Sequence, residues 1–397
     1  MKITKRITKK ISKRISKGQT KKISFQEQTK EQTKKLILGC HISISQSILD
    51  GIKYLESIDG NAAQIFLGSN RSASLKTKTK LSDEDITQIR NYIHQKKITL
   101  IIHSIYLLNF CKANPNSGKV KYMHDNLQHD LKYGALIGAK CVVLHLGSKK
   151  DLEPTLAIKN LIGNIGKILK EMPSGIQLAL ETSAGQGSQV GYTLEELGII
   201  WNGVKHFGNG NKFIKSKIGI CIDTAHIFVS GYDISSVVGI KDYLDKFNNL
   251  IGWKNITNFH LNDSRYPLFS RKDEHRGIGQ GLIYNSPMGM NALKYIKNFC
   301  QHRRIPIILE THRWVLPLSH SYVNGLPETH RWVLPLSHSY VNGLPETHRW
   351  VLPLSHSHMN GLPETHSAGS ADSQGSHKGE HDYKYGYKWE IEMIRKL

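Results

Sequence analysis

Nine ionisable side chains in this chain stand at or just after the ends of short apolar runs. They are His103, His145, Glu181, Asp223, His226, His260, Asp273, His275 and Glu310. A single such histidine is usually a hydrogen-bonded core residue, but carboxylates buried together with histidines would be unfavourable without cations. Imidazole and carboxylate groups suit zinc or manganese, and more than four of them indicate several ions that share carboxylates. The pattern therefore predicts a metal cluster.

The chemistry that such a cluster favours is displacement at phosphorus. Closely spaced divalent ions stabilise both the attacking and the leaving oxygen of an in-line displacement. The formal net charge of +22 favours a polyanionic partner, such as nucleic acid or an anionic membrane surface. No apolar run approaches the roughly 20 residues needed to span a bilayer, so we expect a soluble protein without membrane association. Together these features predict a phosphodiesterase that acts on nucleic acid.

The elements that must position these residues are eight apolar runs that alternate with amphipathic segments. The runs lie at residues 36–43, 62–70, 98–103, 141–148, 176–187, 217–226, 256–264 and 306–311. The helical segments lie at residues 47–58, 83–95, 120–138, 156–172, 194–207, 237–247, 289–299 and 387–397. This order fits an α/β fold of the (β/α)₈ TIM-barrel type better than a doubly wound sheet. We expect the barrel at residues 36–310 and its final helix at residues 386–397.

A basic segment precedes the barrel. Residues 1–35 carry thirteen Lys/Arg against two Glu, and four isoleucines recur every fourth residue between Ile3 and Ile15. Three interpretations stay open: a disordered solvated tail, a tail that adds non-specific phosphate affinity, and a mitochondrial-type presequence. Five singly spaced cysteines predict buried thiols and a reducing, intracellular location. The compartment stays open, with the nucleus or cytoplasm, or a viral factory or virion if the source is viral, favoured over the mitochondrion.

An 18-residue repeat interrupts the chain before its last helix. The unit ETHRWVLPLSHSYVNGLP starts at Glu310 and recurs, nearly unchanged, at Glu328 and Glu346, with a stub at Glu364. Copies this similar indicate duplication in the gene, and we expect a loop-like insertion and linker over residues 311–385. The histidines of the repeat leave a second metal site conceivable, although their spacing argues against it. Only Glu310 follows a strand-like run, so we predict it to be the ligand.

Nine blocks of the chain, in order, resemble the successive motifs of the endonuclease IV family of apurinic/apyrimidinic (AP) endonucleases. They are GCHIS, QIFLGSNR, HSIYLLN, HLGS, LETSAGQGSQVGY, CIDTAHIFVSGYD, FHLNDS, DEHRGIGQGLI and ILET, and they span roughly residues 36–311. The resemblance implies a TIM barrel with three zinc ions that acts as a monomer on duplex DNA. It implies incision on the 5′ side of an abasic site, which leaves a 3′-hydroxyl and a 5′-deoxyribose phosphate.

The resemblance also implies a role for each residue that matches a family motif. One zinc ion would be bound by His103, His145 and Glu181. Glu181 would bridge to a second ion, which Asp223, His260 and Glu310 would complete. The third ion would be bound by His226, Asp273 and His275. Glu181 and Glu310 would be catalytic, with Glu310 able to accept the proton of the nucleophile. Arg71, Tyr106 and Leu107 would enter the kinked DNA duplex at the lesion.

Three departures from the family pattern carry expectations of their own. Leu146 stands where the family usually has proline, and we expect a relaxed loop with its ligand retained. Glu274 stands where arginine is common, which predicts weaker phosphate contact or an extra metal ligand. The repeat follows the strand that carries Glu310, on the rim of the expected site.

Two rival functions remain open at this stage. A metal-dependent sugar isomerase or epimerase of the xylose-isomerase-like barrel type would need fewer ligands and would leave Asp273 and His275 unexplained. A catalytically weakened DNA-binding relative would result if the insertion blocked the site. The abundance of Lys, Ile and Asn, together with the slippage-type repeat, favours a large DNA virus or an AT-rich unicellular organism as the source.

Overall fold

Eight parallel strands close into a barrel in the order β1-β10-β7-β6-β5-β4-β3-β2. The computed structural model describes residues 34–70, 72, 74–207, 216–311 and 386–397. The barrel strands are β1 Leu38–His41, β2 Ala62–Phe66, β3 Thr99–His103, β4 Cys141–His145, β5 Gln177–Glu181, β6 Ile218–Asp223, β7 Ile256–His260 and β10 Ile307–Leu309. The predicted (β/α)₈ barrel is confirmed, because each expected apolar run forms one of these strands.

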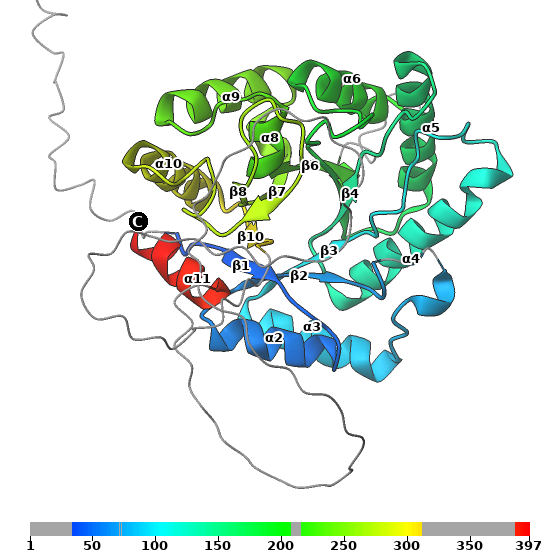
Figure 1. Ribbon diagram of the computed structural model, residues 1–397. Coiled ribbons are helices and arrows are strands. Elements are labelled where there is room, and N and C mark those ends of the chain that lie inside the picture. The colour runs from blue at the N-terminus through cyan, green and yellow to red at the C-terminus, as the bar shows by residue number, and fades with distance from the viewer. Residues whose placement is uncertain (1–33, 71, 73, 208–215, 312–385) are drawn as a thin grey trace, which may run out of the picture. The chain divides into compact units, whose positions relative to one another are not determined.

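The helices surround the strands (Figure 1). They are α2 Ile48–Ser57, α3 Asp83–Lys96, α4 Lys121–Ile137, α5 Pro154–Glu171, α6 Leu194–Lys205, α8 Thr224–Ser230, α9 Val237–Leu250, α10 Pro287–Arg303 and α11 Tyr387–Lys396. Short 3₁₀ turns lie at η2 Leu75–Thr77, η3 Gly118–Val120 and η4 Trp253–Asn255, and a small antiparallel pair is formed by β8 Asp263–Ser264 and β9 His275–Arg276. Side-chain oxygens cap several helix N-termini, among them Ser82, which forms a capping box with Asp85.

Strand register brings the ends of neighbouring strands to the same level. His145 on β4 pairs with Glu181 on β5, and Asp223 on β6 pairs with His260 on β7. β1 and β2 also approach closely, since a Cβ atom on Gly39 would lie 1.7 Å from the carbonyl oxygen of Ala62. Only glycine can occupy position 39 at this spacing. The residues that end the strands therefore face one another at one mouth of the barrel.

The barrel interior is filled by small and β-branched side chains beneath that mouth. The inner cluster consists of Ala62, Ile101, Cys141, Val143, Ala179, Cys221 and Ile308. A larger apolar layer lies between the strands and the helices. All five cysteines are buried thiols, as predicted. The packed interior gives the strand ends a rigid base.

The C-terminal helix α11 lies beside the first strand of the barrel. It packs against β1 and closes the ring of helices in Figure 1. The buried carboxylate of Glu390 accepts hydrogen bonds from the backbone N–H of Ile278 and from the hydroxyl of Thr311, at 2.8 and 2.7 Å. Arg395 also donates to the carbonyl oxygen of Asp59. These bonds tie α11 to segments far away in the sequence.

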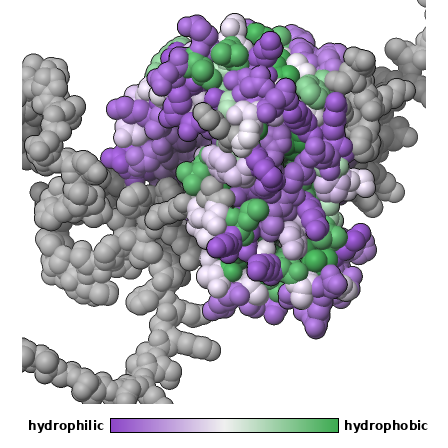
Figure 2. Space-filling model, turned by 90° about the vertical axis from the view of Figure 1, so that its right-hand side faces the viewer, coloured by the Kyte–Doolittle hydropathy of each residue, from purple (hydrophilic) through white to green (hydrophobic). Residues whose placement is uncertain are grey.

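The exposed hydrophobic side chains are scattered among hydrophilic ones on the face drawn in Figure 2. None of the helices in the described part of the chain is long and apolar enough to cross a membrane. The predicted basic tail at residues 1–35 and the predicted insertion at residues 311–385 lie outside the described residues, apart from Lys34, Lys35 and Thr311. Those two domain predictions therefore stay predictions.

Candidate metal centre

The nine residues predicted as metal ligands all lie together at the mouth of the barrel. Three overlapping groups have potential ligand atoms within 4.8 Å of one another. The groups are His103, Glu181 and His260; Glu181, Asp223, His260 and Glu310; and Asp223, His226 and His275. His145 and Asp273 adjoin these groups, because His145 Nε2 lies 2.9 Å from Glu181 Oε2 and Asp273 Oδ2 lies 3.0 Å from His226 Nε2.

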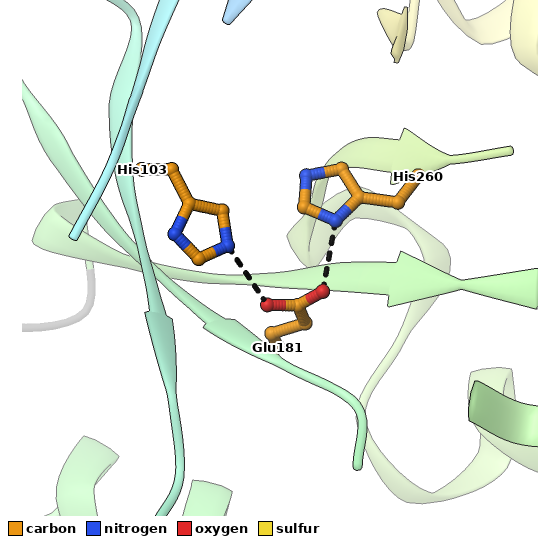
Figure 3. Close-up of side chains that lie close together, drawn as sticks. All are labelled: His103, Glu181 and His260. Carbon is orange, nitrogen blue, oxygen red and sulfur yellow. Dashed lines mark hydrogen bonds and ion pairs between the residues drawn. The ribbon is translucent and has the colours of Figure 1, made fainter. Parts of the chain in front are cut away.

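Glu181, at the end of β5, lies at the centre of the arrangement. Its Oε2 faces His145 and lies 3.4 Å from His103 Nε2, while its Oε1 lies 2.8 Å from His260 Nδ1. Figure 3 shows His103 and His260 approaching the carboxylate from two sides. Burial alone would raise the pKa of Glu181, but the positive charge on His145 and His260 lowers it well below its ordinary value. One carboxylate thus faces both sides of the cluster.

Glu310, just after β10, joins Asp223 beside His260. Glu310 Oε2 lies 3.1 Å from His260 Nδ1, and Asp223 Oδ2 lies 3.8 Å from the same atom. Burial opposes a charge on His260, yet the acidic groups around it, Glu310 and Glu181 among them, raise its pKa well above the ordinary value. The electric field of these carboxylates therefore favours a cation at this position.

The third group forms where α8 begins and where the loop before β9 ends. Asp223 caps α8, with its Oδ1 accepting the backbone N–H of His226 at 2.9 Å. Asp273 reaches His226 through one oxygen and His275 Nε2 through the other, at 3.0 and 3.3 Å. Its backbone N–H is held by Gln186 Oε1 at 2.8 Å, which ties this loop to the one after β5.

In two of the histidines a backbone carbonyl determines which ring nitrogen carries the proton. His103 Nδ1 donates to the carbonyl oxygen of Ser104 at 2.7 Å, and His226 Nδ1 donates to that of Thr182 at 2.8 Å. In both rings the donation at Nδ1 leaves Nε2 to face a carboxylate of the cluster. Metal-ligating histidines are commonly oriented in this way.

The donor set fits divalent cations. Glu181 Oε2 and His275 Nε2 are buried, and among the described residues their neighbours His145 and Asp273 lie within ion-pair distance without forming a hydrogen bond of good geometry. The ion pairs that the described residues make with Glu181, Asp223, Asp273 and Glu310 are formed by histidines, with no lysine or arginine. Buried carboxylates without a fixed positive partner need a cation, and imidazole with carboxylate ligation suits zinc.

A buried carboxylate outside the cluster, that of Asp263, shapes the loop that follows His275. Asp263 accepts the backbone N–H groups of Gly279, Gly281 and Ile283 at 2.8 to 3.1 Å. Burial raises its pKa, while these bonds favour its charged form. Asp263 thus organises the loop rather than adding to the cluster.

Sequence reasoning missed three polar residues at this site. His41 at the end of β1, Gln64 on β2 and Asn262 after β7 all touch the predicted ligands or one another. The signal was visible for His41, because it ends an apolar run like the other histidines. Gln64 interrupts the apolar run AAQIF, which is a weaker signal that a buried partner exists.

Of the three residues predicted to contact DNA, the structure describes Tyr106 and Leu107. Tyr106 and Leu107 follow β3 and are 51% and 48% exposed. The Tyr106 ring also packs edge-on against His145, with ring centroids 5.1 Å apart. Arg71 lies outside the described residues.

Two of the three departures can be located. Leu146 is fully buried, so it packs into the fold where the family pattern has proline. Glu274 pairs with Arg265, whose Nη1 lies 2.5 Å from Glu274 Oε1. Glu274 is not among the clustered residues, so the structure gives no support to the expectation of an extra ligand.

Comparison with known proteins identifies the family of this chain. Residues 52–313 match the family described as a xylose isomerase-like TIM barrel. A probable endonuclease 4 of Campylobacter fetus subsp. fetus is 33% identical over 278 residues, which cover 69% of this chain and 92% of the relative. The chain belongs to the endonuclease IV family.

Further members of the endonuclease IV family match a similar length of this chain. A putative endonuclease 4 of Acanthamoeba polyphaga mimivirus is 32% identical over 279 residues, covering 69% of this chain and 85% of the relative. The crystal structure of endonuclease IV from Thermus thermophilus superposes with a TM-score of 0.57 at 26% identity, covering 70% of this chain and 93% of that one. Membership confirms the prediction that the chain is an enzyme of the endonuclease class.

Proposed function

We propose that the protein is a zinc-dependent AP endonuclease that cuts duplex DNA on the 5′ side of abasic sites. The observation that carries this proposal is the single cluster of nine imidazole and carboxylate side chains, with Glu181 shared between its parts. The endonuclease relatives favour DNA as the substrate. The net charge of +22 supports a polyanionic partner.

The cluster is large enough for three zinc ions. His103, His145 and Glu181 would hold one, Glu181, Asp223, His260 and Glu310 a second, and His226, Asp273 and His275 a third. When bound, such ions supply Lewis-acid stabilisation of phosphate charge and lower the pKa of bound water. The protein holds His103 and His226 in fixed tautomers, and Glu310 offers a carboxylate oxygen that can accept a proton.

The rival functions are weaker for different reasons. A sugar isomerase with one or two ions would leave the Asp273 and His275 side of the cluster without a role. A catalytically weakened relative stays open as a prediction, because the repeat lies outside the described residues.

Incision of a duplex oligonucleotide with one central abasic-site analogue tests the proposal. We expect a 5′-labelled fragment that ends in a 3′-hydroxyl immediately before the lesion, and no cut in the matched undamaged duplex. Equal cutting of both duplexes would contradict lesion specificity. Isomerisation of a ketose without any incision would support the sugar-isomerase alternative.

Replacing Leu107 by alanine is expected to weaken binding to abasic duplex by about tenfold, with little change for undamaged duplex. The reason is that the exposed apolar side chain of Leu107, next in sequence to Tyr106, whose ring packs against His145, can fill the space left by a missing base. Fluorescence anisotropy on the two duplexes measures the effect. Leu136→Ala, an exposed leucine on the outer helix α4, is the control. The role is wrong if both variants behave alike.

Removing residues 1–33 is expected to leave the rate of incision unchanged and to reduce the salt dependence of DNA binding. These residues carry eleven Lys/Arg and two Glu, and each phosphate neutralised adds roughly 0.9 to the logarithmic salt slope. The deletion stops before Lys34, because Lys34 Nζ donates to the carbonyl oxygen of His302. A full-length variant with the tail lysines and arginines changed to glutamine separates charge from length. An unaltered slope in both would show that the tail does not contact phosphates.

A further inference from the structure

Gln64, on β2, is fully buried and contacts three side chains at the mouth of the barrel. Its Nε2 donates to Glu310 Oε1 at 2.5 Å and lies 3.1 Å from His41 Nδ1. Its Oε1 lies 2.8 Å from His260 Nε2. Both ends of the amide are therefore used, and each end contacts a different residue of the same group of predicted ligands.

Glu310 determines which way the amide points. A charged carboxylate can only accept hydrogen bonds, so the NH₂ group of Gln64 must face Glu310 and its carbonyl oxygen must face His260. Because a carbonyl oxygen also only accepts, the proton on this side of the His260 ring must sit on Nε2.

This proton determines which nitrogen of the His260 ring can bind a cation. With a proton fixed on Nε2, His260 Nδ1 is the nitrogen whose lone pair is available to a cation. That atom lies 2.8 Å from Glu181 Oε1 and 3.1 Å from Glu310 Oε2. Gln64 thus aims an imidazole nitrogen and a carboxylate at the same point.

Two neighbours keep the amide in place. The second N–H of Gln64 points to His41 Nδ1, and the His41 ring packs against Phe66 with centroids 4.6 Å apart. Burial lowers the pKa of His41 to about 4, so its ring is neutral. The other oxygen of Glu310 is approached by Asn262 Nδ2 at 3.3 Å.

We propose that Gln64 is a positioning residue of the metal centre, which sets the tautomer of His260 and the orientation of the Glu310 carboxylate. In His103 and His226 the tautomer is set by backbone carbonyls, which a side-chain substitution does not remove. His260 depends instead on a side chain 196 residues away in the sequence. Loss of such a partner typically costs about 10–100-fold in metal affinity or activity. The kinetic part of this inference rests on the proposed function, whereas the metal-binding part does not.

The test compares three variants of the full-length, zinc-loaded protein. Gln64→Met keeps the length of the side chain and removes its three hydrogen bonds, to Glu310, His41 and His260. Gln64→Glu keeps an acceptor for His260 but places a like charge against Glu310. Gln128→Met is the matched control, since Gln128 on α4 is partly buried and donates to the carbonyl oxygen of Ile168. Zinc transfer to a chromogenic chelator, thermal unfolding, and kcat and KM on abasic duplex are measured for each.

We expect Gln64→Met to release zinc about 10–100-fold faster than the wild type and to lower kcat by a similar factor, with KM unchanged. Gln64→Glu should retain zinc at least as well as the wild type, because added negative charge favours cations, yet lose kcat because Glu310 is repelled. Gln128→Met should change neither zinc release nor kcat.

Wild-type rates of zinc release in a folded Gln64→Met variant would overturn the proposal, as would equal changes in Gln64→Met and Gln128→Met. If Gln64→Met fails to fold, Gln64→Glu decides: retained zinc with lowered kcat supports the proposal, and unchanged kcat refutes it. Faster zinc release from Gln64→Met, in a protein whose wild type makes no incision, would support the positioning role while the proposed function fails.

Discussion

Replacing Glu310 by glutamine is expected to lower the rate of incision by about 10³-fold or more, while the fold and most of the DNA affinity are retained. The substitution keeps the size of the side chain and its backbone N–H bond to Asn262 Oδ1. It removes the negative charge that faces His260 and the oxygen proposed to accept a proton. Single-turnover incision, circular dichroism and anisotropy on abasic duplex separate these effects.

The repeat supplies a matched control for this prediction. Glu328 heads an identical Glu-Thr-His-Arg-Trp segment, so Glu328→Gln changes the same residue in the same local sequence. We expect full activity from that variant, because Glu310 directly follows the barrel strand β10. Full activity in Glu310→Gln, with loss of activity in Glu328→Gln, would show that a duplicated segment occupies the site instead.

Replacing Glu181 by glutamine is expected to remove two of the three proposed zinc ions and to abolish measurable incision. Among the carboxylates that the structure describes, Glu181 is the one that lies within 3.4 Å of His103, His145 and His260 together. The neutral amide would bring one oxygen and an N–H group to a place where two oxygens now face histidines. Elemental analysis of the purified protein, with metal and protein counted in the same sample, measures the loss.

His226→Asn is the companion variant, because His226 adjoins Asp273 on the other side of the cluster. We expect it to lose one ion and to keep the pair that shares Glu181. The shared role of Glu181 would be refuted if both variants lost the same number of ions. The shared role predicts a larger loss for Glu181→Gln than for His226→Asn.

Much of the fold and of the ligand set could be predicted because both follow from local patterns. Each barrel strand is a short apolar run, and parallel strands gather their carboxyl ends on one face. A histidine or carboxylate that ends such a run, as His145 and Glu181 do, must therefore come near the others. No knowledge of pairing partners was needed for that step.

The contacts that orient these ligands could not be predicted in the same way. Gln64 meets His260 across the barrel, and the pairing of Glu274 with Arg265 depends on how one loop folds back. Such contacts depend on strand register and loop conformation, which residue spacing does not reveal. The sequence indicated that Glu274 adds a charge to the site, because its pairing with Arg265 could not be predicted from the sequence.

Zinc-dependent incision at abasic sites can be tested on the full chain before chelation, after prolonged chelation, and after zinc is restored, with an abasic duplex as substrate and bound metal counted each time. We expect close to three zinc ions per chain with incision 5′ to the lesion, loss of both on chelation, and recovery of both with zinc. One or two ions without incision, or incision that survives complete removal of metal, would contradict this expectation.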